Sequence, residues 1–513
     1  MNYNNISKKQ MSLNMLSNIV SYSANIIISF LLTPFLINAL GRETYSFYPV
    51  ANTIVSYMSI LTNAMNSMAS RFVTVSLVKG DKSEANKYYS SVLISDIIIS
   101  IFLLVPMFIF IFFIDVFMDI PINSEAAIKC LFILVFSSAI INILATVFGI
   151  ATFAKNRIDL RSLRELILAG LKLILFFLLY KYFIPSIIYV GVVALVIAIL
   201  NIFIQIKYTN MLLPEIKVSK KYFSWKHTKT LFTSSVWNAI NTLGNNLLVG
   251  MSIILANIYY GAGVSGTYSI ANTVPQFING VITMLIGVFY PVITYKYALN
   301  DKKGLIKEII NSQKLVGILG CTIISVFTAL ASNFFALWTP GEDPHYLSIL
   351  SLVTILPHFI ITCTWTLVNL NIVMNKVKIP ALFTLSMGIL NIIVVYLVHY
   401  FFHPGLISLP LISSFIQILS VGLFLPLYAC KNLKLKWFTF YPTVVKSVLC
   451  SVIIISLVSY VKKFFMIQSW FSLFSFAAVT GCITLCFFSF IILGPQNIID
   501  LLKKIILRYL KHK

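Results

Sequence analysis

Residues 48–54 read Tyr-Pro-Val-Ala-Asn-Thr-Ile, and residues 268–274 read Tyr-Ser-Ile-Ala-Asn-Thr-Val. The two stretches lie 220 positions apart, and the same offset joins further residues. These pairs are Gly41 with Gly261, Asp81-Lys82 with Asp301-Lys302, Asn18 with Asn238, and Asn25 with Asn245. A constant offset over two apolar stretches and the loop between them indicates that the chain contains two copies of one unit.

The composition places these copies in a membrane. Of the 513 residues, 59% are hydrophobic and only 10% are charged, and the mean hydropathy is +0.93. Because about 20 apolar residues in a helix cross the hydrocarbon core of a bilayer, the sequence predicts an all-α polytopic membrane protein with about 14 transmembrane helices. The apolar stretches fall at 11–38, 44–70, 88–114, 127–152, 165–183, 186–206, 230–258, 266–293, 311–337, 347–374, 380–402, 407–428, 440–460 and 470–494.

The charge distribution predicts the orientation. The 38 Lys and Arg residues against 15 Asp and Glu residues give a net charge of +23, but they are scattered among the apolar stretches. This pattern indicates cytoplasmic loops rather than a nucleic-acid partner. The basic connections alternate along the chain, which places them and both termini in the cytoplasm. Lys462 and Lys463 break the alternation, so a twelve-span version stays open for the last two helices.

Six expected spans separate the two copies, so both copies enter the membrane in the same sense. Such a parallel repeat predicts two pseudo-symmetric six-helix lobes with a cleft between them. We expect the N-terminal lobe at 1–208, a basic cytoplasmic linker at 209–229 and the C-terminal lobe at 230–430. Two additional helices and a basic tail follow at 431–513, and the amphipathic stretch 498–513 is expected to lie on anionic membrane lipids. The first apolar stretch lacks a cleavage site and is expected to be retained.

Polar residues recur on one face of four of the expected helices. The rows are Asn14, Asn18, Ser21 and Asn25; Ser234, Asn238, Asn241 and Asn245; Asn52, Ser56, Ser59, Asn63, Asn66 and Ser70; and Asn272, Gln276, Asn279 and Thr283. An unpaired amide in hydrocarbon costs roughly 4–8 kcal/mol, so each row needs protein partners or water. Hydrogen bonding between helices is one interpretation. Four rows in register across a repeat favour a hydrated cavity for a polar, sugar-like cargo, and the candidate binding residues are Asn25, Asn52, Asn63, Asn245, Asn272 and Gln276.

The fifth expected helix carries charge within the membrane. Arg161, Glu165 and Lys172 share one face, and Arg164 lies nearby. A charge as deep as Lys172 costs about 2.5–3.5 kcal/mol on insertion scales, so it faces a water-filled path or a partner. A structural pair, either Glu165 with Lys172 or Arg161 with Glu165, is an equally good interpretation.

Two further charged residues lie next to the polar rows. Arg71, at the cytoplasmic end of the second helix, is suited to hold phosphate oxygens, although the positive-inside rule explains it equally well. Asp96, about two turns into the third helix, is the candidate for ion coupling, and the alternative is that it pairs with a basic residue.

The sequence lacks the motifs of several classes of ATPase and enzyme. There is no G-x-x-x-x-G-K-[ST] phosphate loop, no H-E-x-x-H and no G-x-S-x-G, so neither an ATPase of that type nor an enzyme of these classes is predicted. The six histidines and seven cysteines show no ligand spacing. The sequence therefore predicts no metal site and no cofactor.

Two stretches resemble a known family. Leu40-Gly-Arg-Glu-Thr-Tyr-Ser-Phe-Tyr48, continuing to Ala69-Ser-Arg-Phe72 and Lys79-Gly-Asp81, is similar to the first repeat of the polysaccharide flippases. Ala151-Thr-Phe-Ala-Lys-Asn-Arg-Ile-Asp-Leu-Arg161 is similar to that family's cytoplasmic segment. These flippases are the O-antigen and capsule branch of the multidrug/oligosaccharidyl-lipid/polysaccharide exporter superfamily. The chain departs from the pattern at Ser46, where the family often has glycine.

The resemblance implies transfer of an undecaprenyl-pyrophosphate-linked oligosaccharide across a bacterial plasma membrane by alternating access. It implies a cationic cleft, in which Arg71, Arg157, Arg161 and Lys172 are candidate diphosphate contacts. The implied partners are the lipid-linked oligosaccharide, membrane lipids, a polysaccharide polymerase and chain-length proteins.

Two alternative functions stay open. A cation-coupled multidrug antiporter of the same superfamily would favour twelve helices and carboxylates within the membrane. A membrane polysaccharide polymerase would require a large outward loop with catalytic residues, and no such loop is found in the sequence.

Overall fold

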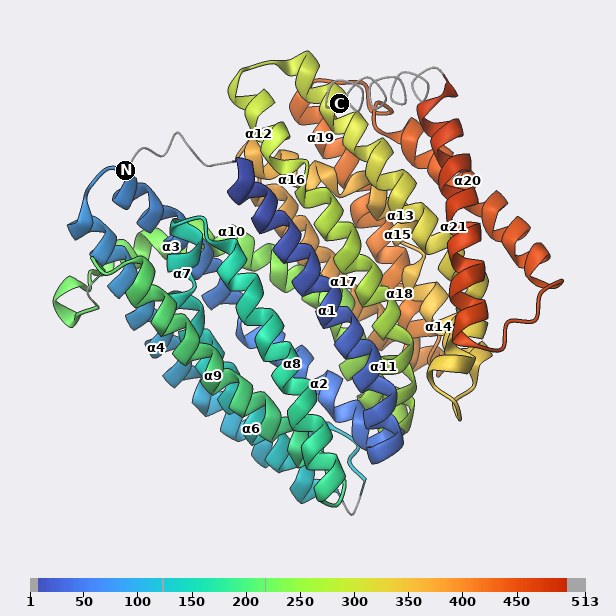
Figure 1. The fold of residues 1–513 in the computed structure, drawn as a ribbon, viewed down its shortest axis with the longest axis horizontal. Coiled ribbons are helices and arrows are strands. Elements are labelled where there is room, and N and C mark those ends of the chain that lie inside the picture. The colour runs from blue at the N-terminus through green and yellow to red at the C-terminus, as the bar shows by residue number, and fades with distance from the viewer. Residues whose placement is uncertain (1–7, 122–123, 217, 496–513) are drawn as a thin grey trace. The chain divides into compact units, whose positions relative to one another are not determined.

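The computed structural model describes residues 8–121, 124–216 and 218–495, and every regular element in these ranges is helical (Figure 1). The predicted all-α class is therefore confirmed. The basic tail at 498–513, with its predicted lipid contact, lies outside the described residues.

The chain divides into two compact units, and the boundary falls between Ser269 and Ile270. The N-terminal unit contains α1 (Lys8–Leu40), α2 (Arg42–Met58), α3 (Ile60–Val78), α4 (Lys82–Phe112), α5 (Ile114–Phe117), α6 (Glu125–Phe148), α7 (Ile150–Ala154), α8 (Ile158–Tyr182), α9 (Ile188–Leu212), the 3-10 turn η1 (Lys220–Tyr222), α10 (Trp225–Asn245), the π-helical η2 (Asn246–Gly250) and the first part of α11 (Met251–Gly287).

The C-terminal unit begins within α11. Its other elements are α12 (Tyr290–Ala298), α13 (Lys302–Trp338), α14 (Pro344–Ile355), α15 (His358–Thr364), α16 (Thr366–Val373), α17 (Lys378–Phe402), α18 (Ser408–Gln417), the π-helical η3 (Ile418–Phe424), α19 (Leu425–Leu433), α20 (Tyr441–Lys462) and α21 (Trp470–Leu493). The lobe boundaries at 208 and 230 follow from the sequence repeat, and they stay a prediction.

Eleven helical segments in the described part of the chain are long and apolar enough to cross a membrane. One of them, Trp225–Tyr297, runs for 73 residues, which at about 1.5 Å per residue is several times the thickness of a bilayer core. It contains the two expected spans at 230–258 and 266–293. The expected spans at 44–70 and 165–183 lie in α2–α3 and α8, which are helical but not among the eleven. The number fourteen therefore stays a prediction, whereas α20 and α21 both qualify as spans.

The backbone repeats where the sequence repeats. Gly41 precedes α2 with φ 77°, and Gly261 kinks α11 with φ 85°. Both values lie in the left-handed region that glycine adopts without steric cost. Asp81 and Asp301 each cap a helix by accepting a hydrogen bond from the backbone N–H three residues on. Residues of the two copies thus form the same helix breaks and caps, which supports the duplication.

The core of each unit is built by apolar helix faces. In the N-terminal unit, α3, α4, α7 and α10 meet in a buried cluster that includes Val73, Tyr89, Ile150 and Leu231. In the C-terminal unit, α20 and α21 pack on α13 through a cluster that includes Cys321, Ile454 and Phe488. The two helices predicted to lie outside the repeat are therefore part of the core of this unit.

The side chain of Lys462, at the end of α20, is hydrogen-bonded to another helix of the C-terminal unit. Its Nζ donates a hydrogen bond of 2.8 Å to the carbonyl oxygen of Ala329 in α13. The ammonium group is thus turned toward a helix backbone, and this contact explains how a basic residue is held at an end that the charge pattern predicts to be outside the cytoplasm.

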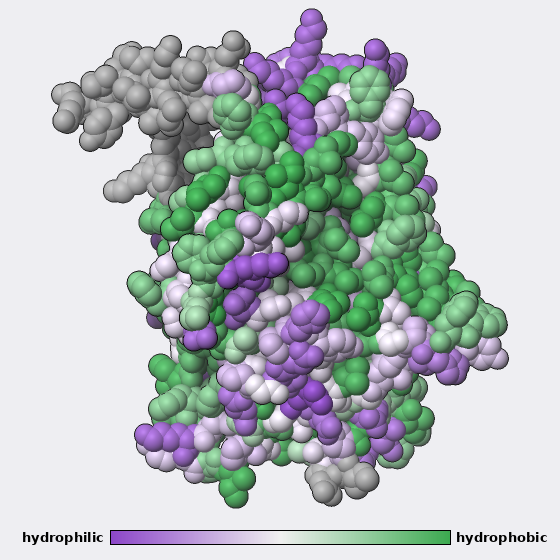
Figure 2. Space-filling view, turned by 90° about the vertical axis from the view of Figure 1, so that its right-hand side faces the viewer, coloured by the Kyte–Doolittle hydropathy of each residue, from purple (hydrophilic) through white to green (hydrophobic). Residues whose placement is uncertain are grey.

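Hydrophobic residues cover much of the face shown in Figure 2, and hydrophilic residues lie at its upper edge and in its middle and lower parts. Exposed leucine, isoleucine, valine and phenylalanine side chains are numerous on α4, α8, α17, α20 and α21. Such a surface is suited to a hydrocarbon environment.

Gly266 gives a test of packing in the N-terminal unit. A Cβ atom at this position would lie 2.4 Å from the carbonyl oxygen of Arg42, whereas a Cβ atom at Gly170 of α8 would meet no atom within 4 Å. We expect Gly266→Ala to destabilise the protein by about 1–3 kcal/mol, because backbone must move to relieve the overlap. Gly170→Ala is the control, and it should leave stability unchanged or raise it by about 1 kcal/mol. Thermal unfolding in detergent measures both, and equal melting temperatures for the two variants would contradict the packing.

Candidate functional site

A cavity of about 350 Å³ lies within the N-terminal unit, among α2, α3, α6, α8 and α9. One part of its wall is polar and the other part is apolar. The polar residues are Tyr48, Asn52, Ser59, Asn63, Ser138, Asn142, Thr146 and Lys172. The apolar residues are Val55, Val135, Ala139, Ile143, Phe176, Val190, Ala194 and Ile197.

The polar wall begins at the junction of α2 and α3. Ser59 separates the two helices, and Asn52 and Asn63 lie on either side of it. Spacings of seven and four residues place the three side chains on one helical face, and all three line the cavity. Asn52 and Asn63 are exposed, and their predicted role in binding a polar cargo stays a prediction. The α2 helix runs without a break through Ser46, whose Oγ donates to the carbonyl oxygen of Glu43 over 2.7 Å.

Among the residues that the structure describes, Lys172 is the only charged one that lines this cavity. Its Nζ lies 3.1 Å from the hydroxyl oxygen of Tyr48 and 5.8 Å from the centre of the Tyr48 ring. In the described part of the chain no carboxylate forms an ion pair with it. The ammonium group therefore has a hydroxyl and an aromatic ring as neighbours, and its charge is not neutralised by these groups.

One of the two structural ion pairs considered for the fifth expected helix, Arg161 with Glu165, is present about two turns before Lys172. Glu165 Oε1 accepts from Arg161 Nε over 2.9 Å and lies 3.6 Å from Arg164 Nη2. Ser21 of α1 donates to the other carboxylate oxygen over 3.3 Å. Because two arginines and a serine surround Glu165, this carboxylate holds α8 to α1 and does not serve Lys172.

Two helices contribute amides that the polar rows of the sequence do not include. Asn142 of α6 lines the cavity, and its Oδ1 accepts from Asn201 Nδ2 of α9 over 2.9 Å. Gln205 continues the chain of amides by donating to Asn201 Oδ1 over 3.2 Å. The four-residue spacing of Asn201 and Gln205 within an apolar helix is the signal that could have indicated this row. In the sequence, Tyr48 stands out only as part of the repeat.

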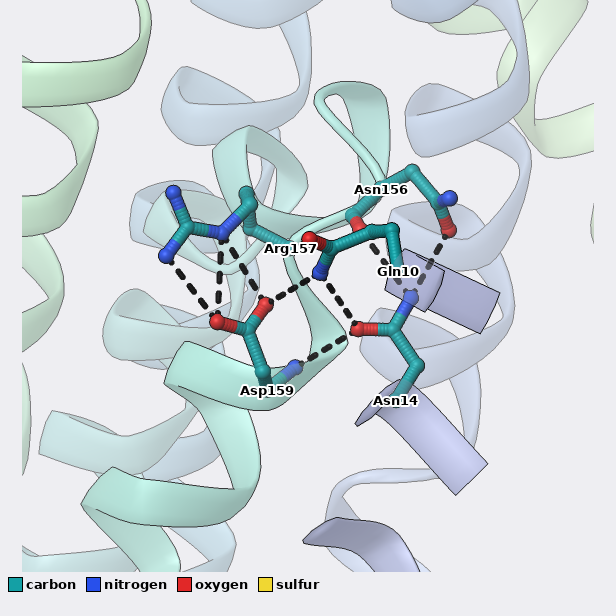
Figure 3. Close-up of polar contacts among 5 residues, drawn as sticks. All are labelled: Gln10, Asn14, Asn156, Arg157 and Asp159. Carbon is teal, nitrogen blue, oxygen red and sulfur yellow. Dashed lines mark hydrogen bonds and ion pairs between the residues drawn. The ribbon is translucent and has the colours of Figure 1, made fainter. Parts of the chain in front are cut away.

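Arg157 belongs to a separate polar cluster (Figure 3). Its Nη2 and Nε donate to the Asp159 carboxylate over 2.9 to 3.2 Å. Gln10 of α1 donates to Asp159 Oδ1 over 2.9 Å and to Asn14 Oδ1 over 3.0 Å. Asn14 in turn donates to the carbonyl oxygen of Asn156 over 3.0 Å and accepts from the backbone N–H of Asp159. The cluster ties the start of α1 to the start of α8, so Asn14 acts as a contact between helices.

The other predicted site residues do not line the cavity. Arg71 and Arg161 are exposed side chains of α3 and α8. Asn25 and Asn245 each donate to the carbonyl oxygen four residues earlier in their own helices. In the second copy, Asn272 is 3% exposed and Gln276 is exposed. The role of each of these residues in binding stays a prediction.

Asp96 is fully buried in α4, and its neighbour is an amide rather than a basic residue. Asn66 Nδ2 donates to Asp96 Oδ2 over 2.6 Å, and Asp96 Oδ1 has no hydrogen-bond partner among the described residues. No Lys, Arg or His in the ranges that the structure describes pairs with it, so the predicted alternative of a basic partner is not observed there. Asn66 lies on α3 three residues after Asn63, which lines the cavity.

The fold and the cavity define a duplicated, multi-span helical membrane protein with a polar interior site. A family model described as "Polysaccharide biosynthesis protein" matches residues 12–295, which is more than half of the chain. The chain belongs to this family, and the resemblance seen in the sequence is confirmed. The uncharacterized membrane protein EpsK of Bacillus subtilis (strain 168) is 25% identical over 494 residues, which cover 95% of this chain and 96% of that protein.

Two solved structures show the same fold. The lipid II flippase MurJ, in an inward closed conformation, has a TM-score of 0.67 at 17% identity over 93% of this chain and 98% of its own. An inward-facing multidrug resistance transporter of the MATE family, from the MOP superfamily, has a TM-score of 0.65 at 13% identity over 83% of this chain and 97% of its own. The fold is therefore shared by a lipid flippase and a drug transporter.

The Asp159 cluster predicts a pH-dependent contribution to stability. Burial raises the pKa of Asp159, but the ion pair with Arg157 and the hydrogen bond from Gln10 outweigh burial and hold the pKa below its usual value. A lowered pKa in the folded state means that the stabilisation is present above the ordinary aspartate pKa of about 3.9 and is lost as the pH falls through the lowered value. We expect Asp159→Asn to lose about 1 kcal/mol at pH 7, because the pair is partly exposed.

The measurement is thermal unfolding in detergent as a function of pH. The difference between the native protein and Asp159→Asn should stay constant down to about pH 4 and narrow below it. Arg157→Gln should show the same profile, and the double variant should lose little more than either single variant. A difference that widens toward acid pH would contradict the assignment.

Proposed function

We propose that the protein is a flippase that moves an undecaprenyl-pyrophosphate-linked oligosaccharide, an O-antigen or capsular repeat unit, across the bacterial plasma membrane by alternating access. Membership of the polysaccharide biosynthesis family supports the substrate class. The fold similarity to a lipid II flippase supports the type of reaction. In this proposal both termini are cytoplasmic, and a polysaccharide polymerase and chain-length proteins act on the delivered units.

The observation that carries the proposal is the ammonium group of Lys172, which lies in a polar cavity of the N-terminal unit, contacts Tyr48 and forms no ion pair with a carboxylate of the described residues. A diphosphate is an anion with many acceptor oxygens, and a cation in a low-dielectric surrounding attracts it strongly. Lys172 therefore has the charge that recognition of the pyrophosphate requires. The exposed Arg71 would meet the anion at the cytoplasmic end. Arg161 and Arg157 are paired with Glu165 and Asp159, so each would bind the anion while it also holds its carboxylate.

The remaining wall is suited to sugar. Amide and hydroxyl groups can exchange hydrogen bonds with sugar hydroxyls, and Phe176 and the aliphatic residues offer surface for the apolar face of a pyranose ring. A volume of about 350 Å³ is at the lower end of the range for small-molecule sites, roughly 300–1,000 Å³. The cavity would hold one part of the cargo, and the lipid chain would stay in the bilayer.

A cation-coupled multidrug antiporter is the second candidate, and the fold supports it as well as it supports a flippase. The charge of the cavity distinguishes the two. A cationic drug would meet Lys172 with like charge and would find no carboxylate among the described lining residues, which favours an anionic cargo.

Deletion of the gene tests the proposal. Lipid-linked repeat units should then accumulate as single units on the cytoplasmic leaflet. Accumulation of unpolymerised units on the outer leaflet would indicate a polymerase instead, and unchanged glycan with altered drug tolerance would indicate the antiporter.

Complementation of that strain tests Lys172. Lys172→Met should reduce glycan export about tenfold or more while the protein stays in the membrane at its normal level, because one strong charged contact is worth at least about 1.4 kcal/mol. Lys172→Arg should retain part of the activity. Lys181→Met is the matched control, because Lys181 lies on the same helix and contacts Phe177 and Tyr182 outside the cavity. Normal export by Lys172→Met would remove Lys172 from the site.

We also propose that Asp96 couples transport to an ion gradient by taking up a proton. Within the described residues the buried carboxylate has a single amide donor and no cation, which is unfavourable, and a proton on Oδ1 would neutralise it. Asn66 links this carboxylate to α3, the helix that also carries the cavity residue Asn63. A change of protonation can therefore move or release a helix that forms the cargo wall.

The variant Asp96→Asn imitates the protonated carboxyl and should fold normally. In sodium-free proteoliposomes, an imposed proton gradient should accelerate cargo transfer by the native protein and leave transfer by Asp96→Asn unchanged. Asp115→Asn is the control, because Asp115 is exposed in α5. An Asp96→Asn variant that responds to the gradient as the native protein does would exclude this role.

A further inference from the structure

A second cavity, of about 280 Å³, lies in the C-terminal unit. It is formed by the end of α12, the connection to α13, the first turn of α13 and the end of α19. The lining residues are Lys296, Tyr297, Asn300, Asp301, Lys302, Leu305, Asn432, Leu433 and Lys434. Figure 1 places α12 and α19 at one end of this unit.

The cavity has an excess of positive charge. It contains three lysines and one aspartate, and the oxygens of this aspartate are engaged. Asp301 Oδ1 accepts from the backbone N–H of Gly304 over 2.8 Å, and Oδ2 lies 3.0 Å from Lys296 Nζ. Neither Lys302 nor Lys434 forms an ion pair within the described residues. Two ammonium groups are therefore available to an anion.

An amide at the cavity also lacks a partner. The Nδ2 atom of Asn432 is buried and donates to no acceptor in the described part of the chain, although Asn432 lines the cavity. A buried donor that has lost water without gaining an acceptor is unfavourable, and a guest with acceptor oxygens would remove this cost. The amide and the two unpaired lysines thus suit the same ligand chemistry.

The backbone fixes the positions of two lining residues. Lys434 has φ 51° and Asn300 has φ 54°, which is the left-handed region that residues with a Cβ atom rarely adopt. Lys434 ends α19, and the following N–H, that of Leu435, donates to the carbonyl oxygen of Cys430 over 2.9 Å. This arrangement is a helix C-cap that holds the lysine backbone in place beside the cavity.

The surroundings have the character of a membrane interface. Tyr295 is 63% exposed, Trp437 is 67% exposed and Phe438 is 46% exposed, and all three lie within a few residues of the lining lysines. Exposed tyrosine and tryptophan side chains are typical of the headgroup level of a bilayer. Lipid headgroups carry phosphate at this level of the bilayer, so we take a lipid as the source of the anion.

We propose that this cavity binds the phosphate group of an anionic lipid headgroup, with Lys302, Lys434 and the Asn432 amide as donors. Lys296 remains paired with Asp301 and contributes charge at longer range. The site lies in the C-terminal unit and shares no lining residue with the cavity proposed to hold the cargo. It therefore does not depend on the proposed flippase function.

The experiment compares lipid binding by purified full-length protein and its variants. Phosphatidylglycerol or phosphatidylcholine is added to the protein in detergent, and bound lipid is counted by native mass spectrometry while the melting temperature is recorded. We expect phosphatidylglycerol to bind the native protein and raise its melting temperature more than phosphatidylcholine does. Lys302→Gln with Lys434→Gln should weaken phosphatidylglycerol binding roughly fivefold for each lysine.

Two further variants separate binding from folding. Lys303→Gln with Lys307→Gln removes the same charge from the same end of α13, and neither residue lines the cavity, so this control should keep its lipid binding. Lys434→Gly removes the ammonium group but suits the left-handed backbone, so it should fold at least as well as the native protein and still bind less phosphatidylglycerol. Equal loss in the test and control pairs would overturn the proposal. Inorganic phosphate that stabilises the native protein as strongly as the lipid does would also overturn it, because the site would then serve a free anion.

Discussion

A bilayer core offers no water to hydrogen-bonding groups, and this constraint decides what each polar residue of the chain does. Amides that reach a partner hold helices together, as Asn14 does between α1 and α8 and Asn66 does between α3 and α4. Other amides face an opening, as Asn52 and Asn63 do. The polar row on α2 and α3 therefore contains amides of both kinds: Asn66 bonds to another helix, whereas Asn52 and Asn63 line the cavity. The reason is that successive turns of the row face different neighbours.

The same constraint explains why the charged residues of α8 have different roles. Glu165 is surrounded by Arg161, Arg164 and Ser21, so its charge is neutralised and serves packing. Lys172, two turns further on, has the hydroxyl and ring of Tyr48 beside it and no carboxylate among the described residues. A charge that is held without a counter-ion is maintained at a cost in stability, which is a common property of binding sites.

The class of fold could be predicted from the sequence because hydropathy, charge alternation and the repeat all act locally. Gly41 and Gly261 illustrate this, since the offset pairs them in the sequence and both adopt positive φ at equivalent places in the two copies. The candidate site could be predicted only in part. Lys172, Asn52 and Asn63 are recognisable because such residues are unusual in apolar helices, whereas Asn142 is brought to the cavity by the packing of α6 on α9. The pairing of Arg157 with Asp159 could not be predicted because it depends on the loop geometry before α8.

The two copies differ in the charge of the helix that carries Lys172 in the first copy. The offset of 220 residues places α8 (Ile158–Tyr182) over α17 (Lys378–Phe402), which also has 25 residues but carries no acidic residue, lysine or arginine after Lys378. An ancestor assembled from two identical subunits would have had to place a lysine in both halves or in neither, because symmetry copies every substitution. Because both copies lie in one chain, a substitution in one copy is not repeated in the other, and α8 can therefore carry Lys172 while α17 carries no acidic residue, lysine or arginine after Lys378.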